Sequence, residues 1–255
     1  MPYFTVGKSQ LYYEEYGEGP TVVLAHGVGG NHASWFNQIP TLSKKYRTIT
    51  IDQRAFGNSE DVEGVGISAF VDDLKALFDH LNIDQAVLVG QSMGGGTLGG
   101  FTCRYPEHVR AFVMCDSSAG IEPPEDLADE WAKIREATWN LSQAERVLGP
   151  NVRNNDPERT LLYLQIASFN SVTIRTVKGD FNKWRIEDLA ATGKPVFFIV
   201  GEDDVLVPPH IIKTLHERTP GSRYCQIDGA GHSAYFEDPK AFNEVLMEYL
   251  AEIHA

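Results

Sequence analysis

A serine lies among glycines directly after an apolar run. The run Ala86–Val89 leads into GQSMGGG, residues 90–96, so that Ser92 occupies the pattern G-x-S-x-G. This pattern is typical of a sharp strand-to-helix turn that exposes a serine hydroxyl as a nucleophile, because small neighbours allow close approach of the chain. The same glycines also occur in turns where the serine is incidental. On its own, the pattern leaves both interpretations open.

A second glycine-rich turn follows the predicted strand Thr21–Ala25. Its sequence is HGVGGNHASW, beginning at His26. Glycines let a backbone N–H face a reacting carbon, so the N–H groups of Val28 and Met93 are predicted to form a two-donor oxyanion hole. We interpret the His26 side chain as a structural hydrogen-bonding group.

Candidates for the acid and the base follow two later strands. GEDDVLVP comes after the predicted strand 195–200 and offers Asp203 and Asp204, while GAGHSAYFEDP comes after 223–227 and carries His232. The chain order Ser, Asp, His, each after its own strand, favours a nucleophile, an acid and a base over a set of unrelated turns.

Strand and helix patterns alternate along most of the chain. Helical stripes of apolar residues occur at 67–81 and 242–253, between runs that are apolar on both faces, as in buried parallel strands. The fold class predicted is therefore α/β, a mostly parallel twisted sheet with helices on both faces. The predicted strands are Tyr3–Val6 and Leu11–Tyr16, which form an edge hairpin, Thr21–Ala25, Tyr46–Ile51, Gln85–Val89, Val109–Cys115, Pro195–Val200 and Arg223–Ile227.

The alternation is interrupted after the sixth strand. Residues 121–190 contain no strong strand pattern and are rich in charge, helix formers and aromatic residues. We expect a helical cap at 121–190, and a core formed by 1–120 and 191–255.

Composition and charge narrow the classes of partner. The 255 residues carry a formal net charge of −13, which argues against nucleic acid and anionic membranes, since both need clustered Lys and Arg. Three widely spaced cysteines without a C-x-x-C pair predict neither a disulfide framework nor a zinc site. The N-terminus has no signal-peptide pattern, and no apolar run approaches the ~20 residues that span a bilayer, so we expect a cytoplasmic protein.

Taken together, these motifs resemble the α/β-hydrolase family, in particular its small cap-bearing esterase, enol-lactonase and C–C hydrolase branch. The resemblance covers essentially the whole chain and rests on HGVGG (26–30), DQRAFGNS (52–59), GQSMGG (90–95), GEDDVLVP (201–208) and GHSAYFEDP (231–239). It implies Asp204 as the triad acid, with Asp116 as a minor alternative, and a reaction without metal or cofactor. Ala55 departs from the family pattern where glycine is usual, and Ser233 stands where the ring-fission C–C hydrolases usually have tryptophan.

The resemblance favours hydrolysis of a small or medium carboxylic ester or lactone that is apolar or weakly polar. A C–C bond hydrolase acting on a vinylogous diketone and a ligand receptor with the same fold are the alternatives. The sequence does not indicate an oligomeric state. The expected substrate pocket consists of Trp35, Gln91, Trp131, Trp139 and Tyr235, and the basic residues considered for an acidic substrate are Arg54, Arg153, Arg159 and Lys183.

Overall fold

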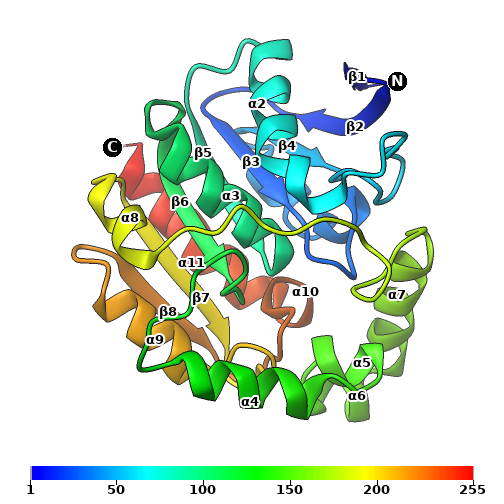
Figure 1. Cartoon of the computed structure of the whole chain (residues 1–255), viewed down its shortest axis with the longest axis vertical. Coiled ribbons are helices and arrows are strands. Elements are labelled where there is room, and N and C mark those ends of the chain that lie inside the picture. Colours follow the sequence, from blue (N-terminus) through cyan, green and yellow to red (C-terminus); the bar gives the residue numbers. More distant parts are fainter. Residues whose placement is uncertain (1, 255) are drawn as a thin grey trace.

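The computed structural model describes residues 2–254, which form an eight-stranded sheet in the order β1-β2-β4-β3-β5-β6-β7-β8 (Figure 1). The two pairings of β2 are antiparallel, and every pairing from β4 to β8 is parallel. The strands are β1 (Tyr3–Val6), β2 (Ser9–Tyr16), β3 (Thr21–Ala25), β4 (Arg47–Ile51), β5 (Ala86–Gln91), β6 (Val109–Cys115), β7 (Val196–Gly201) and β8 (Arg223–Ile227).

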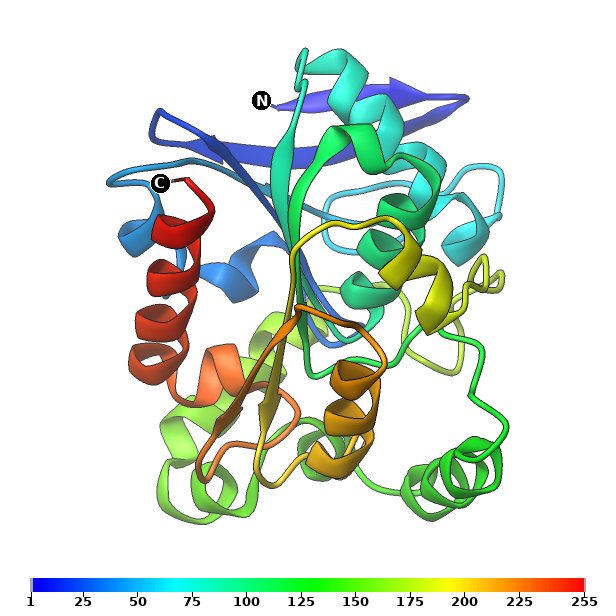
Figure 2. The ribbon, with the colours of Figure 1, turned by 90° about the vertical axis from the view of Figure 1, so that its left-hand side faces the viewer.

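Helices cover both faces of this sheet. Figure 2 shows α11 on one side of the strands and α3, α8 and α9 on the other. The α-helices are α1 (Ile39–Leu42), α2 (Phe70–His80), α3 (Met93–Arg104), α4 (Ala128–Thr138), α5 (Gln143–Val147), α6 (Pro150–Asn155), α7 (Pro157–Ser168), α8 (Ile186–Ala191), α9 (Pro209–Glu217), α10 (Ala234–Glu237) and α11 (Pro239–Ile253). Three short 3₁₀ helices are η1 (His32–Trp35), η2 (Gly66–Ala69) and η3 (Pro106–His108).

The central strands are apolar on both faces because each face is buried under helices. In β3, Val22 and Leu24 belong to the cluster that includes α11, whereas Val23 and Ala25 belong to the cluster that includes α2 and α3. Successive side chains of a strand point to opposite faces, so a strand between two helical layers must be continuously apolar. The fold class expected from the sequence is confirmed, with strand limits that differ from the prediction by at most two residues.

Residues 121–190 lie between β6 and β7 and contain α4 to α8, while residues 169–185 form no helix. Helices α4 to α7 extend along one end of the molecule, beyond the sheet (Figure 1). Helix α8 differs from them, because its Ile186 and Leu189 are fully buried in the same cluster as α3. Helix α8 is the last part of the segment that was expected to form the cap, and its contacts show that it covers the sheet. None of the helices within residues 2–254 combines the length and the apolar character needed to cross a membrane.

The turn between β5 and α3 leaves no space for a methyl group at Gly94. A Cβ there would overlap the backbone carbonyl of Ala25 on the neighbouring strand. We expect Gly94→Ala to lower the free energy of unfolding by about 3 kcal/mol, because backbone must move to relieve the overlap. Urea unfolding measures this change.

Gly100→Ala, in the same helix, is the matched control. Its Cβ would come closest to the Val71 side chain, at 3.2 Å, and would make ordinary contacts with Trp184 (3.7 Å) and the carbonyl of Asn182 (3.8 Å). The gain in helix propensity from Gly to Ala offsets the close contact with Val71, so we expect a change within about 1 kcal/mol. Equal effects of the two substitutions would contradict the tight packing described for this turn.

Candidate active site

Ser92 is held in a strained backbone conformation at the start of α3. Its φ is 50° and its ψ is −116°, a region that L-residues rarely adopt. The Ser92 N–H donates to the carbonyl of Cys115 (3.0 Å), and the Ser117 hydroxyl donates to the carbonyl of Ser92 (2.6 Å). A Cβ at Gly90 would lie 2.7 Å from the backbone of Gly94. The glycines of the motif therefore permit the close contact that fixes this turn.

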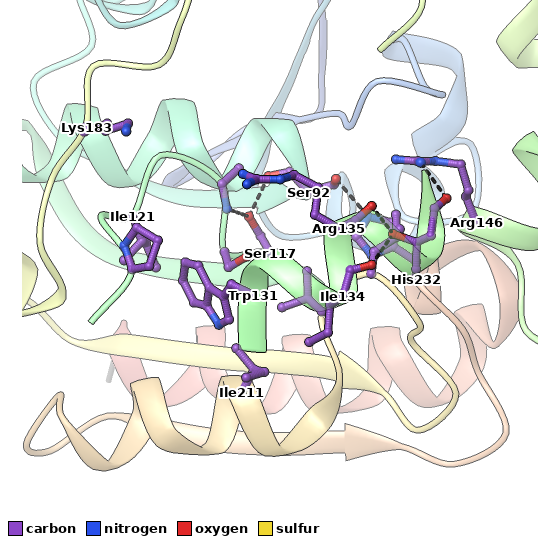
Figure 3. Close-up of a pocket in the computed structure, with 16 residues that line it drawn as sticks. Ser92, Ser117, Ile121, Trp131, Ile134, Arg135, Arg146, Lys183, Ile211 and His232 are labelled. Carbon is purple, nitrogen blue, oxygen red and sulfur yellow. Dashed lines mark hydrogen bonds between the residues drawn. The ribbon is translucent and has the colours of Figure 1, made fainter. Parts of the chain in front are cut away.

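Ser92 and His232 meet although they lie far apart in the chain. The Ser92 Oγ is 2.8 Å from His232 Nε2 (Figure 3). On the other side of the ring, His232 Nδ1 is 2.8 Å from Asp204 Oδ2. An ionised carboxylate only accepts, so His232 Nδ1 carries the proton and Nε2 accepts from the serine hydroxyl. This hydrogen-bonded chain can pass a proton from Ser92 to the imidazole.

Asp204 is the carboxylate that contacts His232. Its side chain is buried, and its Oδ1 also accepts from the N–H groups of Leu206 (2.8 Å) and Val207 (3.0 Å). The adjacent Asp203 is exposed. Both Asp204 oxygens thus have partners that fix the orientation of the carboxylate toward the imidazole.

Asp116 makes different contacts. Its carboxylate accepts from the N–H groups of Gly201 (2.7 Å) and Ala234 (3.2 Å). Burial, together with the nearby Asp204 carboxylate, raises the pKa of Asp116 well above its usual range. In this arrangement Asp116 ties β7 to the loop that carries His232.

The glycine-rich turn after β3 lies against the nucleophile motif. Val28 and Ser92 border the same recess, and Met93 is the first residue of α3. The oxyanion hole from the Val28 and Met93 N–H groups stays a prediction that this proximity supports. His26 is fully buried; its Nδ1–H donates to the carbonyl of Gly27 (2.7 Å) and its Nε2 accepts from the N–H of Gln53 (3.0 Å). These bonds agree with a structural role for its side chain.

A cavity of about 350 Å³ opens beside Ser92 and His232, and Figure 3 shows Trp131, Ile134 and Ile211 along its wall. A second recess of about 60 Å³ adjoins the same two residues and is bordered by Gln91. The Gln91 amide also donates to the carbonyl of His232 (2.7 Å). Of the expected pocket residues, Trp131 lines the cavity and Gln91 borders the recess.

The other three expected pocket residues do not line this cavity. Trp35 and Tyr235 are fully buried against each other, with ring centroids 4.5 Å apart, in the core on the α11 face of the sheet. Trp139 is 44% exposed and stacks with Arg175 on the outer surface. The prediction was wrong for these residues, because aromatic residues that fill the core and those that line a pocket have the same composition signal.

Most of the basic residues considered for an acidic substrate are engaged elsewhere. Arg54 is buried and pairs with Asp73 (2.6 Å), and Arg159 pairs with Asp156 (3.1 Å). Arg153 donates to a backbone carbonyl. Only Lys183 of this group lines the cavity, together with two arginines that the sequence did not single out, Arg135 and Arg146.

Glu237 is a third residue that the sequence analysis did not single out. Its carboxylate accepts from the N–H groups of Gly231 (2.9 Å) and Ser233 (3.3 Å), on either side of His232. It also accepts from the N–H of Gly149 (2.7 Å), which belongs to the 121–190 segment. One buried carboxylate therefore joins that segment to the loop of His232.

Residues 2–254 contain no group of three His, Cys, Asp or Glu side chains arranged to hold a metal ion.

Residues 20–239 match the family model described as the alpha/beta hydrolase fold, so the chain belongs to this family.

Individual members can be compared over nearly their whole length. The non-heme bromoperoxidase candidate BpoC of Mycobacterium tuberculosis is 29% identical, over 96% of this chain and 99% of its own. A thermophilic esterase from Thermogutta terrifontis, solved with malate bound, is 26% identical with a TM-score of 0.82, covering 99% and 97% of the two chains. Est816, described as an N-acyl homoserine lactone degrading enzyme, is 26% identical with a TM-score of 0.80, covering 97% and 100%. The esterase and the lactone-degrading enzyme support a hydrolase of the ester or lactone type.

The buried Glu237 predicts a pH-dependent contribution to stability. Burial raises its pKa from 4.5 to about 7, so between these values the folded state holds a proton that the unfolded chain releases. The stabilising effect of that proton is complete below the unfolded pKa and is lost as the pH rises through the folded pKa. The non-ionising variant Glu237→Gln lacks this dependence.

Urea unfolding of both proteins at about pH 5 and about pH 7.5 measures the difference. The stability of the wild type relative to Glu237→Gln should fall by on the order of 3 kcal/mol over that interval. Glu244→Gln, at an exposed position, controls for the loss of one negative charge. A constant difference between wild type and Glu237→Gln across this interval would contradict the raised pKa.

Proposed function

We propose that this protein is a serine hydrolase that cleaves a small or medium carboxylic ester or lactone through an acyl-enzyme. The observation that carries the proposal is the hydrogen-bonded chain from Ser92 Oγ through His232 to Asp204, with 2.8 Å at each step. The Ser92 end of this series of hydrogen bonds faces a cavity large enough for a small organic substrate.

In the first half of the reaction, Ser92 attacks the substrate carbonyl while His232 Nε2 takes the hydroxyl proton. Asp204 keeps the proton on Nδ1 and stabilises the imidazolium that forms. The N–H groups of Val28 and Met93 are the donors proposed for the oxyanion, each contributing about 3–4 kcal/mol at the transition state. His232 then protonates the leaving alkoxide, and the acyl group remains on Ser92.

In the second half, water attacks the acyl-enzyme. His232 takes one proton from the water, and the carbonyl carbon gains its hydroxyl oxygen. Collapse of the tetrahedral intermediate returns the proton to Ser92 and releases the carboxylic acid. With a lactone, the alcohol and the acid leave as one molecule. The protein's own side chains supply every proton transfer in this scheme.

Ser92→Ala should remove nearly all turnover, on the order of 10⁶-fold in kcat, because the three groups act as a unit. The variant should keep the far-UV circular dichroism of the wild type, since alanine removes only the hydroxyl. A panel of short p-nitrophenyl esters, lactones and a vinylogous diketone measures the loss. Faster hydrolysis of the diketone than of any ester or lactone would contradict the proposed substrate class.

Asp204→Asn should lower kcat by about 10⁴-fold, because an amide at this position favours the wrong tautomer of His232. The neighbouring Asp203→Asn is the matched control and should change kcat by less than about 10-fold, since its exposed carboxylate acts only through screened electrostatics. Steady-state kinetics on one ester compares the two variants. A crippled Asp203→Asn beside a nearly normal Asp204→Asn would refute the assignment of the acid.

A further inference from the structure

The cavity beside Ser92 is lined by cations, although the chain as a whole is acidic. The sequence has 35 Asp and Glu residues against 22 Lys and Arg residues. Among the described residues, Arg135, Arg146 and Lys183 line the cavity, and no Asp or Glu does. The sign of the charge at the cavity is therefore opposite to that of the protein, which favours entry of an anionic group.

Arg146 has the most informative position of the three. It lies on α5 and is half-buried, whereas Arg135 and Lys183 are exposed. It borders both the cavity of about 350 Å³ and the adjoining recess of about 60 Å³, as do Ser92 and His232. Arg146 is therefore part of the wall of both spaces that adjoin Ser92.

The Arg146 guanidinium is anchored but lacks an anionic partner. Its Nη1 donates to the carbonyl of Thr138 (3.0 Å). Seven other arginines have a carboxylate within 4.0 Å, but no carboxylate of residues 2–254 lies that close to Arg146. Burial and the nearby Arg175 lower the pKa of Arg146, as expected for a cation that is partly desolvated without an opposite charge.

We infer that Arg146 forms the binding site for a carboxylate carried by the ester or lactone substrate, at a position remote from the bond that is cleaved. The planar guanidinium can donate two parallel hydrogen bonds to a carboxylate. Arg135 and Lys183 add positive potential along the cavity wall. Trp131, Ile134 and Ile211 offer an apolar surface for the carbon skeleton between the two ends.

This inference rests on the proposed function and narrows its substrate class. The sequence suggested an apolar or weakly polar substrate. The apolar wall of the cavity fits the carbon skeleton of such a substrate. Arg146 adds the requirement that one end of the substrate carries a negative charge. The substrate class is thus a half-ester of a dicarboxylic acid, or an ester or lactone with a carboxylate on the alcohol side.

Two pairs of substrates test the inference, each comparing a carboxylate with its isosteric carboxamide. Monomethyl glutarate and methyl 4-carbamoylbutanoate place the group on the acyl side. The butanoate esters of 3-hydroxypropanoate and 3-hydroxypropanamide place it on the alcohol side. The wild type should prefer the carboxylate in at least one pair by about tenfold in kcat/KM, which corresponds to about 1.4 kcal/mol. Titration of the carboxylic acid that each hydrolysis releases, at constant pH, measures the rates.

Variants then assign the preference to Arg146. Arg146→Gln should reduce the carboxylate-to-carboxamide ratio about tenfold, mainly through KM, and Arg146→Glu should invert it. Arg104→Gln is the control: this exposed arginine pairs with Asp72, and its loss removes the same charge without altering the ratio. A structural role of Arg146 would lower both rates together and leave the ratio unchanged.

A wild-type ratio of one or less in both pairs would overturn the inference, even if both Arg146 variants failed to fold. An unchanged ratio in Arg146→Gln would also overturn it. In either case, hydrolysis of the neutral esters would leave the proposed function intact. Failure of the wild type to hydrolyse any ester or lactone would instead overturn the proposed function, and this inference with it.

Discussion

The close approach of α3 to β3 and β5 determines where the chemistry of this protein can occur. Gly94 lies against the carbonyl of Ala25, and Gly90 lies against the backbone of Gly94, so a side chain at either position would push the helix away. That contact holds Ser92 at a φ of 50° and directs its hydroxyl toward His232. The backbone strain at Ser92 is local. Its free-energy cost is offset by the packing of the buried apolar clusters on the two faces of the sheet. The same turn brings the N-terminus of a helix to the nucleophile, where N–H groups favour negative charge.

Three buried carboxylates organise the loops around this turn. Asp116 joins β7 to the loop of His232, Asp204 orients the imidazole, and Glu237 connects that loop to Gly149 in the 121–190 segment. Backbone N–H donors surround Asp116 and Glu237, and these hydrogen bonds oppose the effect of burial on their pKa values. Their contacts link the position of the imidazole to the helices that form the wall of the cavity, so the site and its surroundings are held as one unit.

The sequence was sufficient for the fold and for the residues that meet at Ser92. Both depend on local signals: strands buried on two faces are continuously apolar, and the residues after parallel strands gather at one edge of the sheet. The cavity wall depended on how helices of the 121–190 segment pack, which no local pattern encodes. Trp35 was misplaced for another reason, because an aromatic residue of the core has the same sequence signal as one that lines a pocket. Arg146 went unnoticed because an unpaired arginine differs from a paired one only in three dimensions. The apolar stripe at 242–253 predicted a helix there but gave no sign that Glu237, which precedes it in the chain, bridges two segments.

Mass spectrometry of the acylated protein tests the proposed chemistry most directly. Wild-type protein mixed with p-nitrophenyl butanoate and quenched in acid within milliseconds to seconds should carry a butanoyl group on the peptide that contains Ser92. The amount of acylated protein should match a burst of p-nitrophenol, since both report the same intermediate. Butanoylation of another residue, or a burst of p-nitrophenol without an acylated Ser92, would contradict the assignment of Ser92 as the nucleophile.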